Sequence, residues 1–126
     1  MTDDLAEQLA VARARARWCH AYLVDLRLIQ LIDELLAIVQ AHPQDLNWQT
    51  YYDDQQELLS DLRDHSERVR RGDGSRLPEL KFSLLPTGDL NEIAFSSGWG
   101  DAYVRLANEF DDLYTGPASP PRKARR

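Results

Sequence analysis

The sequence predicts an α+β protein that is mainly α: a long antiparallel helical hairpin, with a β-hairpin and a C-terminal helix packed on it. Residues 22–39 are almost continuously apolar, and apolar residues recur at helical spacing in residues 48–71 and 99–113. Apolar and polar residues alternate with a period of two only within residues 80–95. A chain of 126 residues with 43% hydrophobic content can form one core, so we expect a single globular domain over residues 1–116.

The first predicted helix begins near Asp4, a residue type that caps helix N-termini. Its apolar positions alternate steps of four and three, which keeps one seam facing a neighbour. These positions are Leu5, Leu9, Ala12, Ala16, Cys19, Leu23 and Leu26. The helix should end at Ala41 or His42, because Pro43 disfavours helical geometry in the residue before it. Its length leaves open a kink or break within residues 17–22.

The second predicted helix runs from Trp48 or Thr50 to Arg71, and Gly72 beyond it is a typical helix stop. A short connection indicates that the first two helices pack antiparallel.

A β-hairpin is the expected structure of residues 80–95. Apolar and polar residues alternate in residues 80–84 and again in residues 92–95. The intervening sequence, Pro86-Thr87-Gly88-Asp89, is typical of a turn, because proline pre-sets one backbone angle and glycine accepts a positive one.

Charge and cysteine content limit the classes of partner and location. The net charge is −6, although four of the 15 basic residues crowd into the last five positions. An acidic body argues against nucleic acid as the main ligand, because Lys and Arg contacts to phosphate supply most of that affinity. Cys19 is the only cysteine and no secretory signal opens the chain, which predicts a cytoplasmic protein. Charged residues interrupt the most apolar stretch, so we expect no membrane span.

The last ten residues, 117–126, form a predicted disordered basic tail, because they carry no apolar period. We interpret this tail as a solubilising end. Recruitment of nucleic acid or membrane lipid, or nuclear entry in a eukaryote, is the alternative.

The strongest surface signal is a set of four acidic residues on one face of the second helix, within an arc of about 80°. This acidic stripe consists of Asp54, Glu57, Asp61 and Asp64. Like charges at this spacing cost about 0.2 to 0.5 kcal/mol per pair, and no Lys or Arg interleaves along these four positions to supply a counter-charge. The stripe therefore favours a basic protein partner. The alternatives are a plain solvated face, or neutralisation by arginines of the first helix, in the same chain or across a dimer. Those arginines are Arg13, Arg15 and Arg17.

Three aromatic residues are candidate anchors for a partner, because Trp and Tyr often carry interface energy. They are Trp48, Tyr52 and Trp99. The alternative for each is a place in the core.

The sequence contains none of the common catalytic signatures: no phosphate-binding glycine loop, no nucleophile elbow, no paired cysteines. Asp61 and His65 could form half a metal site, and Cys19 beside His20 suggests a thiolate–imidazole pair. We interpret Asp61 and His65 as a solvated surface pair, and Cys19 as a small core residue. Asp25 falls among apolar neighbours, where a carboxylate needs a partner such as Arg17 or a tyrosine hydroxyl. We predict no enzyme, no cofactor and no metal. A metal-dependent or acid–base enzyme using Asp61, His65 and Asp25 is the alternative.

A resemblance to known proteins lies in the last third of the chain, residues 77–115. The residues that carry it are Leu85-Pro86-Thr87-Gly88-Asp89-Leu90-Asn91-Glu92-Ile93 and a later helix ending in Leu106-Ala107 and Phe110-Asp111. They resemble small uncharacterised bacterial proteins with two helices, a glycine-turn hairpin and a closing helix, some of which resemble immunity proteins that neutralise toxins of competing cells. The resemblance implies a bacterial binding protein, and it transfers no site residues.

From charge and resemblance together we predict a non-enzymatic acidic binding protein, an immunity-type inhibitor that occludes a basic toxin or nuclease with the acidic stripe. The alternative is a homo-oligomeric structural or adaptor domain. In that alternative the first helix pairs across a two-fold axis through Leu5, Leu9 and the arginines of the same helix.

Overall fold

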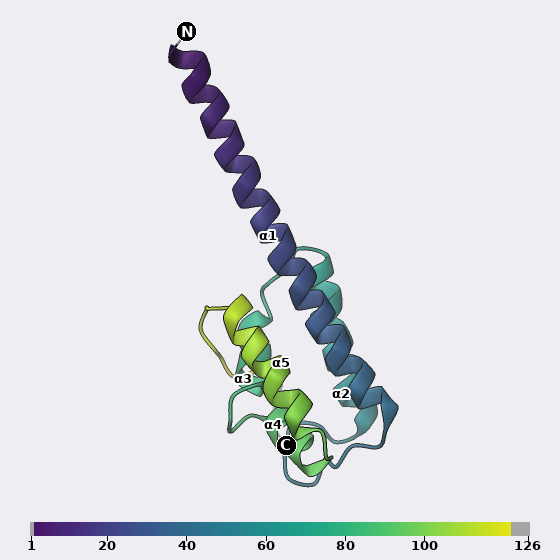
Figure 1. The fold of residues 1–126 in the computed structure, drawn as a ribbon. Coiled ribbons are helices and arrows are strands. Elements are labelled where there is room, and N and C mark those ends of the chain that lie inside the picture. The colour runs from purple at the N-terminus through teal and green to yellow at the C-terminus, as the bar shows by residue number, and fades with distance from the viewer. Residues whose placement is uncertain (1, 122–126) are drawn as a thin grey trace.

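The computed structural model describes residues 2–121, with side chains for residues 4–17 and 23–121. All regular structure in this part of the chain is helical. The helices are α1 (Thr2–Ala41), α2 (Gln55–Arg70), α3 (Leu77–Ser83), α4 (Asp89–Ser96) and α5 (Gly100–Leu113). Figure 1 shows that the N-terminal half of α1 projects from a body built by its C-terminal half and the other helices.

Helix α1 is continuous over its 40 residues, so the break left open within residues 17–22 does not occur. It ends at Ala41, two residues before Pro43, as the sequence predicts. Its first half is rich in Ala and Arg, which have high intrinsic helix propensity. Local propensity therefore supports the helix where no other element contacts it.

Helices α1 and α2 run antiparallel. Near the end of α2, the Ser66 hydroxyl donates a hydrogen bond to Asp33, while near its start the Gln55 side chain donates to the Val39 carbonyl. The sequence order of these contacts is opposite in the two helices, which fixes their relative direction. The face of α2 turned towards α1 is apolar and buried, as its helical spacing predicts.

The predicted start of α2 at Trp48 or Thr50 is wrong, because the helix begins at Gln55. The Gln49 side chain accepts hydrogen bonds from the backbone N–H groups of Tyr51 and Tyr52, and its amide donates to two carbonyls. These bonds satisfy backbone groups that a helix would otherwise use.

The predicted β-hairpin and the α+β class are wrong, because residues 80–95 are divided between α3 and α4. Pro78 stands in the first turn of α3, where its fixed backbone angle favours a helix. In α4 the buried residues Leu90, Ile93 and Ala94 follow helical spacing. Phe95, which a strand would turn to the same side as Ile93, is 57% exposed. Short apolar runs of this kind fit both the strand period of two and the helix period of 3.6, so alternation alone does not distinguish a strand from a helix.

Gly88 is the N-cap of α4 and lies against the backbone of α3. A Cβ at Gly88 would stand 2.2 Å from the Ser83 carbonyl oxygen, whereas one at Gly74 would meet only the flexible end of Leu77 at 3.3 Å. We expect Gly88→Ala to lower the free energy of unfolding by about 1 to 3 kcal/mol, because backbone atoms must shift to admit the methyl group. Urea titration of both variants measures this, and an equal effect of Gly74→Ala would contradict it.

The core lies between α1, α2 and α5, with α3 and α4 closing the remaining side (Figure 1). Its residues with no measurable exposure are Ile32, Leu35, Val39, Leu58, Leu90, Ile93, Ala94, Leu106 and Phe110. Helix α5 is fastened to α1 by two ion pairs, Arg27 with Glu109 and Arg105 with Glu34. The inner face of α5 is the predicted one, since Tyr103, Leu106 and Phe110 are buried.

The chain after α5 returns to α3. The Ser119 amide donates a hydrogen bond of 3.0 Å to the Pro78 carbonyl, and the Lys81 ammonium lies 5.6 Å from the centre of the Tyr114 ring. Residues 122–126, which carry the basic charges of the predicted tail, lie outside the described residues. The disorder of residues 117–126 stays a prediction.

Candidate functional site

Two carboxylates of the acidic stripe bond arginines of the same chain. Asp61 accepts a hydrogen bond of 2.7 Å from Arg76 and one of 2.6 Å from the Tyr52 hydroxyl. Asp64 accepts hydrogen bonds of 2.7 Å from Arg76 and 2.8 Å from Arg68. The premise that these groups lack counter-charges is therefore wrong. The counter-charges come from α2 and from the N-cap of α3, not from the arginines of α1.

The other two members of the stripe lie at the start of α2. The Asp54 carboxylate accepts a hydrogen bond of 2.8 Å from the Glu57 backbone amide, and this makes Asp54 the N-cap of the helix. Glu57 is partly buried in the first turn, where a negative charge favours the helix dipole. Both positions thus contribute to helix stability.

Arg76 is the centre of the charged cluster. Its guanidinium bonds Asp61, Asp64 and Glu79 at 2.6 to 2.7 Å, and its side chain is 19% exposed. Burial alone would lower the pKa of Arg76, but its bonds to Glu79 and Asp61 raise that pKa overall. The hydrogen bond from Arg76 also lowers the pKa of Asp64. Sequence reasoning missed Arg76, because it lies 12 and 15 residues from two of its partners and no helical period connects them.

His65 lies beneath this cluster, buried, with its Nε2 atom 3.8 Å from Asp61. Burial lowers the pKa of His65 to about 4. The pair interpreted as a solvated surface pair is therefore a buried one. Among the residues with described side chains, no three His, Cys, Asp or Glu groups converge to hold a metal ion.

A cavity of about 490 Å³ lies beside Arg76 and the returning segment at Ser119. Its charged lining includes Asp61 and Arg68, and each is already bonded: Asp61 to Arg76, and Arg68 to Asp64. The cluster therefore ties α2 to α3. The acidic and basic residues of this lining are paired with one another or with Asp64.

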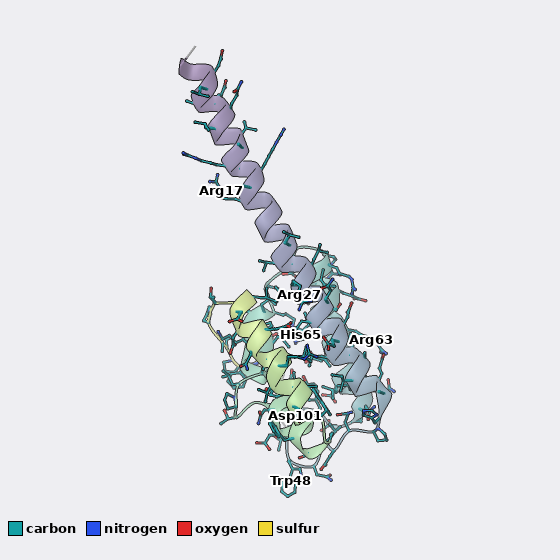
Figure 2. All side chains as sticks on the ribbon, in the orientation of Figure 1. Arg17, Arg27, Trp48, Arg63, His65 and Asp101 are labelled. Carbon is teal, nitrogen blue, oxygen red and sulfur yellow. The ribbon has the colours of Figure 1, made fainter. Side chains whose placement is uncertain are left out.

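The three candidate anchors differ in exposure. Trp48 is 72% exposed and points away from the body (Figure 2). Tyr52 and Trp99 are buried: the Tyr52 hydroxyl donates to Asp61, and the Trp99 indole N–H donates to the Gln44 side chain. Of the three, only Trp48 offers its ring to a partner.

The second candidate site is the arm, defined as residues 4–23 of α1. Every described side chain from residue 4 to 17 is exposed, as the arm projects from the body (Figure 1). Leu5, Leu9 and Leu23 are 59%, 50% and 60% exposed. Large aliphatic side chains gain about 1.5 to 3 kcal/mol each when fully buried, so this spacing of leucines is typical of a face that another element covers.

The apolar positions of the arm lie on one side of α1, away from the centre of the core. We call Leu5, Leu9, Ala12 and Ala16 the arm seam; Leu23 and Leu26 continue it. At 100° per residue the centre of the seam lies roughly 70° and 110° around α1 from Leu31 and Leu35, and roughly 125° from the mean direction of the buried residues of α1. Leu9 and Ala16 lie in line with Arg27 and Glu34, about five turns later, and α5 bonds both of those residues.

Further along α1, within the body, residues in line with the seam are also exposed to solvent. Gln30, Ala37 and Ala41 on this stripe are exposed. Helices α2 and α5 bond α1 on either side of it, through Asp33 and Glu34 respectively. Because the bonds from α5 to Arg27 and Glu34 lie in line with the seam, a partner helix has free access to the seam only along the arm.

Asp25 is half-buried near the base of the arm. The predicted bond to Arg17 is not formed, because Arg17 is exposed and extends from the arm (Figure 2). The side chains of Cys19 and His20 lie outside the described residues, so their interpretation stays a prediction.

Comparison with family models, with curated proteins and with solved structures finds no match. The resemblance to immunity proteins accordingly stays a prediction. Among residues 2–121, no helix combines the length and the apolarity needed to cross a membrane. Over residues 2–121, fold and contacts define an all-helical body that carries a projecting helical arm (Figure 1).

Proposed function

We propose that this chain is a non-enzymatic homo-oligomeric assembly module that associates through the arm of α1. The observation that carries the proposal is the exposed arm seam on a helix that projects beyond its own core. Leu5 and Leu9 lie four residues apart and are followed on the seam by Ala12 and Ala16. This pattern favours close packing of one helix against another. An isolated helix gains little stability in water without such packing.

The proposal includes a cytoplasmic location, supported by a single cysteine in the chain. The immunity-type inhibitor stays a prediction from the sequence. That prediction depended on an acidic stripe without counter-charges. Asp61 and Asp64 instead form ion pairs with an arginine of the same chain.

Sedimentation of the full chain at micromolar concentration tests the proposal. We expect the wild-type protein to associate, and Leu5→Glu with Leu9→Glu to shift it to monomer, because a charge in a helix interface must be desolvated. The matched control is Val104→Glu, since Val104 is an exposed aliphatic residue of α5, 45% exposed, outside the arm. A wild-type protein that stays monomeric at about 100 μM, where even weak specific interfaces are populated, would reject the proposal.

A further inference from the structure

The segment after α5 fixes the starting point of the basic residues that follow it. The Ser119 amide donates a hydrogen bond of 3.0 Å to the Pro78 carbonyl of α3, and Ser119 and Pro120 line the cavity of about 490 Å³ beside Arg76. The basic run, defined as residues 122–126, therefore begins two residues beyond this cavity. Its charged members are Arg122, Lys123, Arg125 and Arg126.

Carboxylates outnumber cations around this cavity. Two guanidiniums, those of Arg68 and Arg76, bond four carboxylates: Asp61, Asp64, Asp73 and Glu79. Among the residues with described side chains, no further Lys or Arg lines this cavity or the one that adjoins it. The charged cluster therefore keeps a net negative charge, and a further cation placed beside it is attracted.

The adjoining cavity extends the first one towards the start of α2. We call it the tyrosine groove; it has a volume of about 400 Å³, and its lining includes Tyr51, Tyr52 and Glu57. Tyr51, Asp61 and Arg76 line both cavities, so the two are continuous. The two tyrosine rings lie edge to face with 4.7 Å between their centres. Tyrosine rings among carboxylates suit Arg and Lys, whose aliphatic stems pack on rings while their charged heads reach the carboxylates.

We propose that the basic run binds the tyrosine groove of its own chain. Five extended residues span about 17 Å, so a run that starts beside the first cavity reaches the second. Pro120 and Pro121 restrict the backbone at the start of the run, which lowers the conformational entropy lost on binding. Because the run and the groove belong to one chain, the effective concentration of the run is in the millimolar range. This inference does not rest on association through the arm.

The bound run competes with any foreign basic partner of the acidic stripe. Glu57, Asp61 and Asp64 belong both to the stripe and to the lining of the groove. A basic partner at this surface has to displace the run, because both require the same carboxylates. The basic run therefore acts as an internal competitor that covers this face of α2.

NMR relaxation of the backbone amide nitrogens in the full chain tests the proposal, because it reports how fast residues 122–126 move. We expect these amides to relax like those of the core helices at low salt, and like a free chain at about 0.5 M salt. The groove variant, Asp53→Asn with Glu57→Gln, should lower the equilibrium constant for binding of the run at least about threefold. The matched control, Asp4→Asn with Glu7→Gln, removes the same charge from the arm and should leave it unchanged.

A second variant keeps the test valid if the groove variant folds poorly. It replaces the four charged members of the basic run by glutamine and leaves the body unaltered. We expect the amide signals of Tyr51, Tyr52 and Glu57 to shift relative to wild type, whereas those of residues 5–16 in the arm stay in place. Unshifted groove signals would contradict binding of the run.

Three further results would overturn the proposal. The first is a basic run that relaxes like a free chain at low salt, and the second is an equal effect of the groove variant and its control. The third is ordering of the run that rises between about 50 and 500 μM protein, because binding within one chain does not depend on concentration. A protein that is monomeric at every concentration would reject association through the arm and leave this inference standing.

Discussion

Replacing Arg76 by methionine is expected to lower the free energy of unfolding by about 3 kcal/mol, because it leaves buried or half-buried carboxylates without their cation. Asp61, Asp64 and Glu79 all bond this guanidinium, and they would then face one another. Methionine keeps most of the volume of the side chain, so lost packing contributes little. Urea unfolding at pH 7 measures the effect.

The control for Arg76 is Arg63→Met on the exposed side of α2 (Figure 2). Exposed substitutions of this kind usually change stability by less than about 0.5 kcal/mol. The loss of unfolding free energy in Arg76→Met should also become smaller towards pH 4, because the carboxyl groups around Arg76 take up protons and no longer repel one another. Equal losses in the two variants would mean that the cluster does not stabilise the fold.

Stability is expected to fall by about 3 kcal/mol as the pH drops from 6.5 to about 4, because His65 is buried as a neutral imidazole. Its pKa is lowered to about 4 in the folded protein, against about 6.5 for a free side chain. Within that window the unfolded chain binds the proton and the folded protein does not. The contribution is therefore fully present above pH 6.5 and is lost as the pH falls.

His65→Gln is the informative variant, because glutamine does not titrate in this range. The slope of unfolding free energy against pH should be flatter in His65→Gln than in wild type between pH 6.5 and 4.5. Identical slopes would show that His65 takes up its proton equally in both states.

The sequence predicts the helices correctly where apolar residues keep helical spacing over many residues. Helix α1 ends before Pro43 and α2 ends before Gly72, which adopts a positive φ of 76°. The error at residues 80–95 has a physical cause: α3 and α4 have seven and eight residues, too few for a helical period to outweigh apparent alternation. Pro78 and Gly88 were the local signals that favoured helices.

The candidate sites were only partly predictable. The acidic stripe does lie on α2, but its partner Arg76 comes from a loop after the helix, and no local pattern specifies such a distant ion pair. The seam at Leu5 and Leu9 was visible as a spacing of apolar residues. That it points away from the core follows only from which residues of α1 the body buries.

Amide hydrogen exchange of the arm at two protein concentrations tests the central claim most directly. If arms pair between copies, amides in residues 5–16 exchange slowly at high concentration and rapidly at low concentration, because an unpaired helix opens readily. Amides of the core helices should not respond to concentration. Arm amides that exchange at the same rate at both concentrations would contradict association through the arm.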